Sequence, residues 1–262
     1  MSYAEVNGIN LYYEIHGSGK PVILLHGGLG SGEMFPPEFL AAFTAEYRVI
    51  LPDLQGHGRT ADIDRPLDSR EMARDVAALI DHLGLEKPDV VGYSLGAKVA
   101  MDLAIESPEK IGRLVPAAMG IRRDAAYPAI LDQQGQMGEE SAAFLKDTPM
   151  YELYQRVAPH PEHFPRLLGK IGEAMRQDYD LTEGIRGLRV PTLIIGADAD
   201  MVPAGHYAEI FALLGGGQRD GGWDRSGRPE GGHALAILPG TTHYDILESP
   251  LFLQTVLTFL RS

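Results

Sequence analysis

The stretch DVVGYSLGAKVAMDLA, residues 89–104, changes in its middle from β-forming residues to an alanine-rich sequence with helical spacing. At the change, a serine, Ser94, stands between two glycines in GYSLG, residues 92–96. Glycine is needed on either side when a turn is so tight that a Cβ would clash, and the serine inside such a turn takes strained backbone angles. The stretch therefore predicts a strand, a sharp turn that carries Ser94, and a helix.

Short apolar runs like the one before Ser94 recur along the chain. Runs without polar alternation are typical of strands buried on both faces of a parallel sheet. They occupy residues 21–25, 47–51, 112–119, 190–196 and 234–238. Residues 9–15 alternate apolar and polar side chains instead, which indicates a half-buried, antiparallel strand.

Segments with helical spacing lie between these runs. The clearest spans residues 72–83, with Asp68 and Glu71 before it as a capping pair and Gly84 after it. Another follows the last apolar run, at residues 252–260. This alternation of strands and helices predicts an α/β fold, in which helices flank a wound and mostly parallel sheet.

The alternation stops between about residue 120 and residue 188. Several short helical patterns punctuated by prolines fill this segment, so we interpret it as a helical cap inserted after one strand. The predicted domains are a core of residues 1–119 and 189–262 and a cap of residues 120–188. Some apolar residues of the cap either line a pocket or pack the cap onto the sheet, namely Met137, Phe144, Met150, Tyr151, Tyr154 and Met175.

A second irregular segment, residues 215–233, is a glycine-rich, charged loop that holds Trp223, the only tryptophan of the chain. Because it leads from a helix to the start of the strand at 234–238, we expect it at the amino ends of the strands. Trp223 is predicted to anchor this loop or to form a subunit contact, and a homodimer is the oligomer that we consider.

Size, charge and cysteine content limit the class of protein. A chain of 262 residues is long enough for one large core. Its formal net charge of −13 argues against nucleic acid or an anionic membrane as a partner. The absence of cysteine excludes disulfides and thiolate zinc sites. With no secretory signal and no apolar run of about 20 residues, a cytoplasmic protein is expected.

A hydroxyl such as that of Ser94 is a poor nucleophile at neutral pH and needs a base, a group that orients the base, and donors for the oxyanion. His243 lies in a short loop after the last predicted strand, where a base can reach the serine. Asp198 and Asp200 follow the preceding strand. Either can supply the orienting carboxylate.

Two backbone amides are candidate oxyanion donors. The N–H of Leu95 lies at the N-terminus of the helix after Ser94, where the free amides and the helix dipole favour a negative oxygen. The N–H of Gly28 lies in the glycine-rich stretch ILLHGGLGSG, residues 23–32. In the alternative interpretation Ser94 merely caps a helix, which leaves its occurrence together with an acid and a base unexplained.

Nucleotide-binding loops do not fit the glycines of this region. A dinucleotide fingerprint would need glycine where Glu33 stands. In GSGKP, residues 17–21, Pro21 replaces the hydroxyl that a phosphate loop offers to magnesium. We therefore expect no cofactor and no metal ion.

Together these stretches resemble the α/β-hydrolase fold family, at the level of its serine-dependent esterase, lactonase, C–C hydrolase and perhydrolase branch. The resemblance covers nearly the whole chain and rests on HGG at 26–28, DLQGHG at 53–58, GYSLG, the acid loop and the histidine loop, in the order Ser, Asp, His. It implies an eight-stranded sheet with a helical cap over the serine.

The acid loop departs from the family pattern by one residue. In the family the acid precedes a proline by four positions, and Pro203 would place it at Ala199. Asp200 keeps the more typical spacing to the helix that we expect near His206, so it is favoured over Asp198.

The resemblance implies a serine hydrolase that acts on a small or medium carboxylic ester or lactone through Ser94, His243 and Asp200. A C–C bond hydrolase, a perhydrolase and a non-catalytic protein that binds a small ligand are the alternatives. Serine at this position argues against relatives that attack carbon with an aspartate, such as haloalkane dehalogenases. Arg122 and Arg123, just past a strand end, either hold a substrate carboxylate or lie solvated at the surface.

Overall fold

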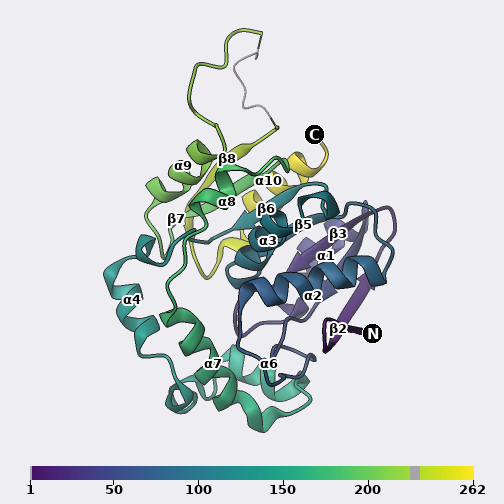
Figure 1. Ribbon diagram of the computed structural model, residues 1–262, viewed down its shortest axis with the longest axis vertical. Coiled ribbons are helices and arrows are strands. Elements are labelled where there is room, and N and C mark those ends of the chain that lie inside the picture. Colours follow the sequence, from purple (N-terminus) through teal and green to yellow (C-terminus); the bar gives the residue numbers. More distant parts are fainter. Residues whose placement is uncertain (1, 225–230) are drawn as a thin grey trace.

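The computed structural model describes residues 2–224 and 231–262 of the chain. In these residues one sheet has the strand order β1-β2-β4-β3-β5-β6-β7-β8, with helices on both faces (Figure 1). The strands are β1 (Ser2–Val6), β2 (Ile9–His16), β3 (Lys20–Leu25), β4 (Tyr47–Pro52), β5 (Asp89–Tyr93), β6 (Leu114–Ala117), β7 (Leu193–Ala199) and β8 (Ala234–Thr242). The α-helices are α1 (Pro37–Thr44), α2 (Ser69–His82), α3 (Leu95–Glu106), α4 (Pro128–Gly135), α5 (Ala142–Leu145), α6 (Pro149–Val157), α7 (Phe164–Arg176), α8 (Thr182–Arg186), α9 (Ala204–Leu213) and α10 (Pro250–Leu260).

The sheet is mostly parallel, as the apolar runs predict. Strand β2 pairs antiparallel with β1 and β4, and every pairing from β4 through β3, β5, β6 and β7 to β8 is parallel. The predicted α/β-hydrolase fold class is therefore confirmed. Because parallel strands end at the same edge of the sheet, residues just after β3, β5, β7 and β8 can meet there.

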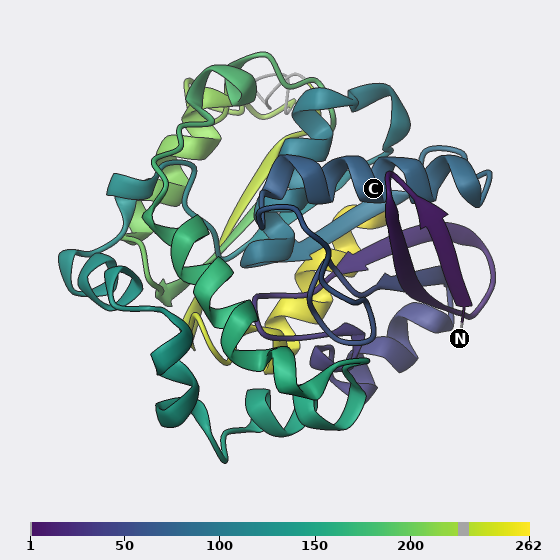
Figure 2. The same ribbon diagram turned by 60° about the horizontal axis from the view of Figure 1, so that its bottom comes forward.

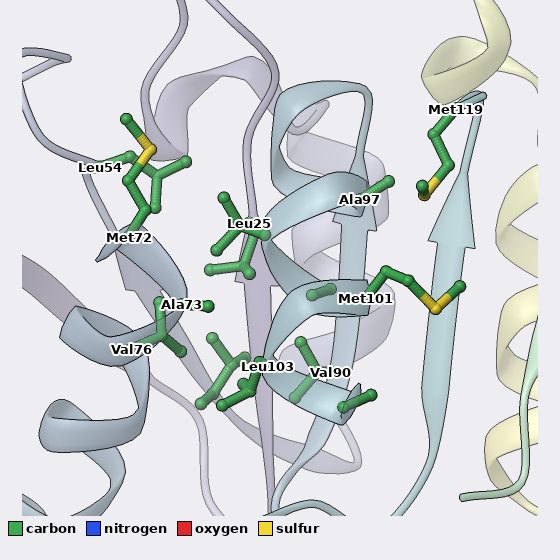
Figure 3. Close-up of a cluster of buried hydrophobic side chains, with 14 of the residues drawn as sticks. Leu25, Leu54, Met72, Ala73, Val76, Val90, Ala97, Met101, Leu103 and Met119 are labelled. Carbon is green, nitrogen blue, oxygen red and sulfur yellow. The ribbon is translucent and has the colours of Figure 1, made fainter. Parts of the chain in front are cut away.

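Side chains of the central strands alternate between two apolar layers. Val22 and Leu24 pack into the layer with α1 and α10, whereas Ile23 and Leu25 pack into the layer with α2 and α3. Figure 3 shows this second layer, in which Leu25 lies among side chains of β5, α2 and α3. Burial on both faces explains why these strands read as continuous apolar runs.

The clearest predicted helix is confirmed as α2. Its capping residue Asp68 accepts hydrogen bonds from the amides of Arg70 and Glu71. One predicted strand is shorter than expected, since β6 spans Leu114–Ala117 rather than residues 112–119.

The alternation predicted for residues 9–15 is wrong at two positions. Tyr12, predicted on the solvent face, is buried, and its hydroxyl donates to Glu14. The guanidinium of Arg59 lies over the Tyr12 ring at 5.2 Å, so a loop covers the face that we expected in water. Ile15, predicted inside, is exposed near the end of β2.

Helices α4 to α8 lie between β6 and β7 in the chain, in the segment where the sequence predicts helical patterns. Helices α4 to α7 gather at one end of the sheet, below it in Figure 1 and toward the viewer in Figure 2, whereas α8 packs beside α9. The described part of the glycine-rich loop lies at the other end, as predicted from its place between α9 and β8. Residues 225–230 of that loop lie outside the described residues.

Trp223 does not anchor this loop. Its side chain is fully exposed, so the prediction of an anchoring contact within the chain is wrong. The subunit contact and the homodimer stay predictions.

Glycine at position 96 lets α3 approach β3, and its replacement tests that contact. A Cβ on Gly96 would lie 2.2 Å from the carbonyl oxygen of Leu25, whereas a Cβ on Gly205, in the first turn of α9, meets nothing within 4 Å. We expect Gly96→Ala to lower the free energy of unfolding by at least about 2 kcal/mol, the cost of overpacking a close contact.

The matched control, Gly205→Ala, should raise that free energy by up to about 1 kcal/mol, because alanine favours helix. Urea denaturation of both variants and of the wild type measures the two effects. Equal stability of Gly96→Ala and Gly205→Ala would contradict the close approach.

Candidate active site

Ser94 lies at the tight turn between β5 and α3. Its φ of 53° and ψ of −114° are the strained backbone angles that the sequence predicts for this serine. A Cβ on Gly92 would lie 2.2 Å from the carbonyl oxygen of Gly96, so both flanking glycines are needed. The amide of Ser94 donates to the carbonyl of Ala117 in β6, which fixes the turn on the sheet (3.0 Å). Holding a residue at such backbone angles costs on the order of 1–3 kcal/mol, and the packing of the surrounding strands offsets this cost.

The structure brings Ser94, His243 and Asp200 into one hydrogen-bonded chain. Ser94 Oγ lies 3.0 Å from His243 Nε2, and His243 Nδ1 lies 2.7 Å from Asp200 Oδ1. Nδ1 donates its proton to the carboxylate, which leaves Nε2 as an acceptor for the serine hydroxyl. The three residues follow β5, β8 and β7, so the sheet edge assembles them from distant parts of the chain.

The two candidate acids have different partners. Asp200 is buried and bonds to the histidine, whereas Asp198 accepts hydrogen bonds from the amides of Gly240 and Thr241 near the end of β8 (2.9 and 3.2 Å). Asp198 thus holds the strand that leads to His243 and does not contact the imidazole.

Several donors converge on the Asp200 carboxylate. The hydroxyl of Tyr207 donates to Oδ2 at 2.6 Å, and the amides of Met201 and Ala197 donate at 2.7 and 3.3 Å. Burial alone would raise the pKa of Asp200, but the hydrogen bonds and charge of His243 together with the Tyr207 hydroxyl outweigh it and hold the pKa below its usual value. The carboxylate is therefore ionised and fixed in position opposite the imidazole.

Tyr93 positions the histidine loop from the other side. Its hydroxyl donates to the backbone carbonyl of His243 at 2.5 Å, and the two rings lie 5.5 Å apart. Neither Tyr93 nor Tyr207 was identified from the sequence. The hydroxyl of Tyr93 bonds a residue 150 positions away in the chain, and that of Tyr207 bonds a residue 7 positions away. No sequence motif marks either tyrosine.

The two predicted oxyanion amides, those of Gly28 and Leu95, line the same cavity as Ser94 and His243. Within residues 2–224 and 231–262 neither N–H has an acceptor, so both are free to donate to a ligand. A Cβ on Gly28 would meet nothing within 4 Å, which shows open space beside its backbone.

A buried histidine holds the loop of Gly28 in place. His26 Nε2 accepts from the amide of Leu54 at 3.0 Å, and Nδ1 donates to the carbonyl of Gly27 at 2.7 Å. Burial lowers the pKa of His26 to about 4, so the ring is neutral at physiological pH and serves as one donor and one acceptor. The ring of His57, which is also buried, lies 5.4 Å away.

The cavity above Ser94 has a volume of about 530 Å³. Its walls come from the ends of β5, β6 and β7, from the start of α2 and from the segment 120–188. Of the six apolar residues singled out in that segment, Met175 lines the cavity. Tyr154 instead packs beside Phe164 with 5.2 Å between ring centroids, and Phe144 is exposed.

Arg122 and Arg123 also line the cavity, but protein groups engage both. Arg122 forms a two-pronged ion pair with Glu209, and Arg123 Nε donates to the carbonyl of Met175 at 3.0 Å. His206 lies in the first turn of α9 as expected, where its Nε2 accepts from the amide of Ile121.

Comparison with known proteins gives the family. Residues 22–253 match the model of the family described as "Alpha/beta hydrolase family". The chain belongs to this family. Because the family consists of hydrolases and the similar proteins are named as hydrolases, the chain is an enzyme with hydrolase activity.

Individual relatives have more specific names. The chain is 30% identical over 229 residues to "Putative carbamate hydrolase RutD" of Azorhizobium caulinodans, covering 81% of this chain and 85% of that protein. It is 26% identical to the 2-hydroxy-6-oxo-6-phenylhexa-2,4-dienoate hydrolase of Comamonas testosteroni, covering 82% and 84%. A thermophilic esterase from Thermogutta terrifontis, solved with malate bound, superposes with a TM-score of 0.73 at 22% identity, covering 100% and 98%.

The described residues show neither a metal site nor a membrane-spanning helix. No group of three His, Cys, Asp or Glu side chains in this part of the chain is arranged to hold a metal ion. No helix within the described ranges has the length and apolar character needed to cross a membrane.

Removing the Tyr207 hydroxyl tests its bond to Asp200. Because the folded protein lowers the pKa of Asp200, the ionised carboxylate contributes stability above its unfolded pKa of about 4, and this is lost as pH falls through the folded pKa. We expect Tyr207→Phe to lower the free energy of unfolding by about 1.5–3 kcal/mol at pH 7. The difference from the wild type should shrink below about pH 4.

Urea denaturation at pH 7, 5 and 3.5 measures this effect, with the exposed Tyr127→Phe as the control that should change little. A loss for Tyr207→Phe that is the same at every pH would show that the hydroxyl does not act on the ionised carboxylate.

Proposed function

We propose that this protein is a serine hydrolase that cleaves a small or medium carboxylic ester or lactone through an acyl-enzyme. The observation that carries the proposal is the chain Ser94–His243–Asp200, with 3.0 and 2.7 Å between the bonded atoms, at the floor of a cavity that admits a ligand. A chain of hydroxyl, imidazole and carboxylate in this geometry is the arrangement that activates a serine.

In the first step His243 Nε2 removes the hydroxyl proton as Ser94 Oγ attacks the carbonyl carbon. The carbonyl oxygen becomes an oxyanion, and the free amides of Gly28 and Leu95 donate to it. His243 then returns the proton to the leaving alcohol, and an ester of Ser94 remains. Asp200 stays ionised throughout and stabilises the imidazolium that forms between the two proton transfers.

In the second step water replaces the alcohol. His243 removes a proton from the water, which attacks the acyl-enzyme, and the same two amides hold the second oxyanion. Collapse of this intermediate releases the carboxylic acid and returns the proton to Ser94. In a lactone the alcohol and the acid are parts of one molecule, so the same steps open the ring.

We infer that residues 120–188 act as a cap on a core of residues 1–119 and 189–262. Gly120, Ile171 and Tyr179 line the cavity, which supports a role of this segment in covering the substrate. A cavity of about 530 Å³ suits a small or medium molecule.

A second candidate substrate is a carbamate. The 30% identity to a protein named as a carbamate hydrolase favours it, and attack on a carbamate carbonyl uses the same nucleophile, base and oxyanion donors. A panel of methyl esters, lactones and carbamates of similar size, compared by kcat/KM, separates the two classes.

Ser94→Ala is the direct test of the nucleophile. We expect wild type to release p-nitrophenol from p-nitrophenyl butyrate with a burst and to be labelled by a fluorophosphonate. Ser94→Ala should lose the label and at least about 10⁴-fold of kcat. Intact mass spectrometry locates the label. A variant with full activity, or a wild type that takes no label, would refute the acyl-enzyme and favour C–C cleavage without a serine ester or a non-catalytic ligand-binding role.

The two neighbouring aspartates provide a matched pair of variants. Asp200→Asn should lower kcat by about 10³- to 10⁴-fold, because the amide no longer holds the imidazole in the correct tautomer. Asp198→Asn should keep a kcat close to wild type, since Asp198 bonds only backbone amides. The kcat of both variants is measured with p-nitrophenyl butyrate. A larger loss for Asp198→Asn than for Asp200→Asn would assign the orientation of the imidazole to Asp198 instead.

A further inference from the structure

Lys98 is a charged residue of the cavity that the proposed chemistry leaves unused. It lies one helical turn after Ser94 on α3, and its amide donates to the carbonyl of Ser94 at 3.1 Å. One turn advances about 5.4 Å along a helix. Lys98 and Ser94 line the same cavity.

The ammonium of Lys98 has few partners for its three N–H donors. It donates to Ser69 Oγ, and it lies 3.6 Å from Asp102 Oδ2, too far for a hydrogen bond. The ring of Tyr179 lies below it, with 4.5 Å from Nζ to the centroid. Among the described residues, therefore, only one of the three donors is used.

Asp102 forms an ion pair with Lys98 on the side away from the cavity. It follows one turn later on α3, is buried, and does not line the cavity. Its Oδ2 has no hydrogen-bond donor among the described residues, so the ammonium is its nearest compensating charge. Asp102 and the Tyr179 ring thus fix the ammonium at the cavity wall, while its spare donors remain available to a ligand.

Arg70 provides a second positive charge on the same wall. It follows Ser69 in the first turn of α2 and lines the cavity. Within the described ranges its guanidinium forms no hydrogen bond or ion pair. Unlike Arg122 and Arg123, it has no protein partner that competes with a ligand.

The acidic residues of this wall are already engaged. Asp68 accepts from the amides at the start of α2, and Asp180 accepts from the amide of Thr182. Asp178 is almost fully exposed and lies 3.9 Å from Arg123. Among the charged side chains of this wall, Lys98 and Arg70 therefore keep donors without a protein partner in the described ranges, and the unpaired Oδ2 of Asp102 lies outside the cavity lining.

The position of Lys98 relative to His243 indicates which part of an ester it meets. His243 comes from β8, at one edge of the sheet, and protonates the leaving alcohol in the proposed mechanism. Ser69 begins α2, which contacts α3 and β1 toward the opposite edge. In the proposed mechanism the leaving alcohol faces His243, which puts the acyl part on the side of Lys98.

We propose that the substrate's acyl part ends in a carboxylate on a short linker, which Lys98 binds by a charged hydrogen bond with Arg70 beside it. The substrate class is thus a half-ester of a dicarboxylic acid, or the lactone equivalent that bears a free carboxylate. This inference rests on the proposed function, since it assigns a specificity-determining residue to the same site.

The test compares monomethyl glutarate, which carries the carboxylate, with dimethyl glutarate, which does not. Methanol release gives kcat/KM for each substrate, and their ratio is the anion preference. We expect Lys98→Met to lower this ratio by about 10- to 100-fold, the usual value of a hydrogen bond between charged groups. Lys98→Arg, which keeps the charge, should restore most of the preference.

Two further variants keep the test decisive. Lys110→Met removes a lysine that pairs with Asp81 outside the cavity and should leave the ratio unchanged. Arg70→Met changes an exposed side chain, so it retains the fold if Lys98→Met does not, and it should lower the ratio in the same direction. Monomethyl succinate and monomethyl adipate then report the linker length that spans Ser94 and Lys98.

The failures of the inference and of the proposed function are distinguishable. A wild type that takes the fluorophosphonate label and hydrolyses dimethyl glutarate, with a ratio that neither Lys98→Met nor Arg70→Met lowers, overturns the carboxylate site and leaves the serine hydrolase intact. A wild type that takes no label overturns both. An equal loss on both substrates in Lys98→Met assigns the residue a structural role and also overturns the inference.

Discussion

The close approach of α3 to β3 is the constraint on which the rest of the site depends. Gly96 allows the helix to touch the carbonyl of Leu25, and two residues earlier the chain must turn through the strained angles of Ser94. The same contact brings the end of β3, with Gly28, beside the start of α3, with Leu95. The proposed nucleophile and the proposed oxyanion amides are therefore placed by packing of backbone against backbone, which is more rigid than side-chain contact.

The proposed acid and base, Asp200 and His243, lie next to a local irregularity in the sheet. The register between β7 and β8 shifts between Ala197 and Ala199, immediately before Asp200. The extra residues of this irregularity lie on β8, just before His243, and Asp200 rather than Asp198 reaches the imidazole. Asp198 still contributes, because its bonds to the amides near the end of β8 hold the strand from which His243 projects.

Much of the fold can be predicted because β3, β5 and β7 are buried on both faces and therefore appear as uninterrupted apolar runs. The members of the proposed triad can be found because each follows a predicted strand and the parallel sheet gathers strand ends. Tyr207, Tyr93 and Lys98 could not be found in this way, since each owes its position to packing between distant segments, and a lysine on a helix ordinarily lies in water. Tyr12 was misplaced for the same reason, because its coverage by the loop of Arg59 is a tertiary property.

The hydrogen bond from Tyr93 to the backbone of His243 joins residues 150 positions apart. Parallel pairings between such remote segments form slowly, because loop closure precedes any stabilising contact. During synthesis the turn of Ser94 and the helix α3 leave the ribosome long before β8 exists. The nascent polypeptide thus carries Ser94 without His243 beside it until β8 has joined the sheet, so the hydrogen-bonded chain of Ser94, His243 and Asp200 forms only at a late stage of folding.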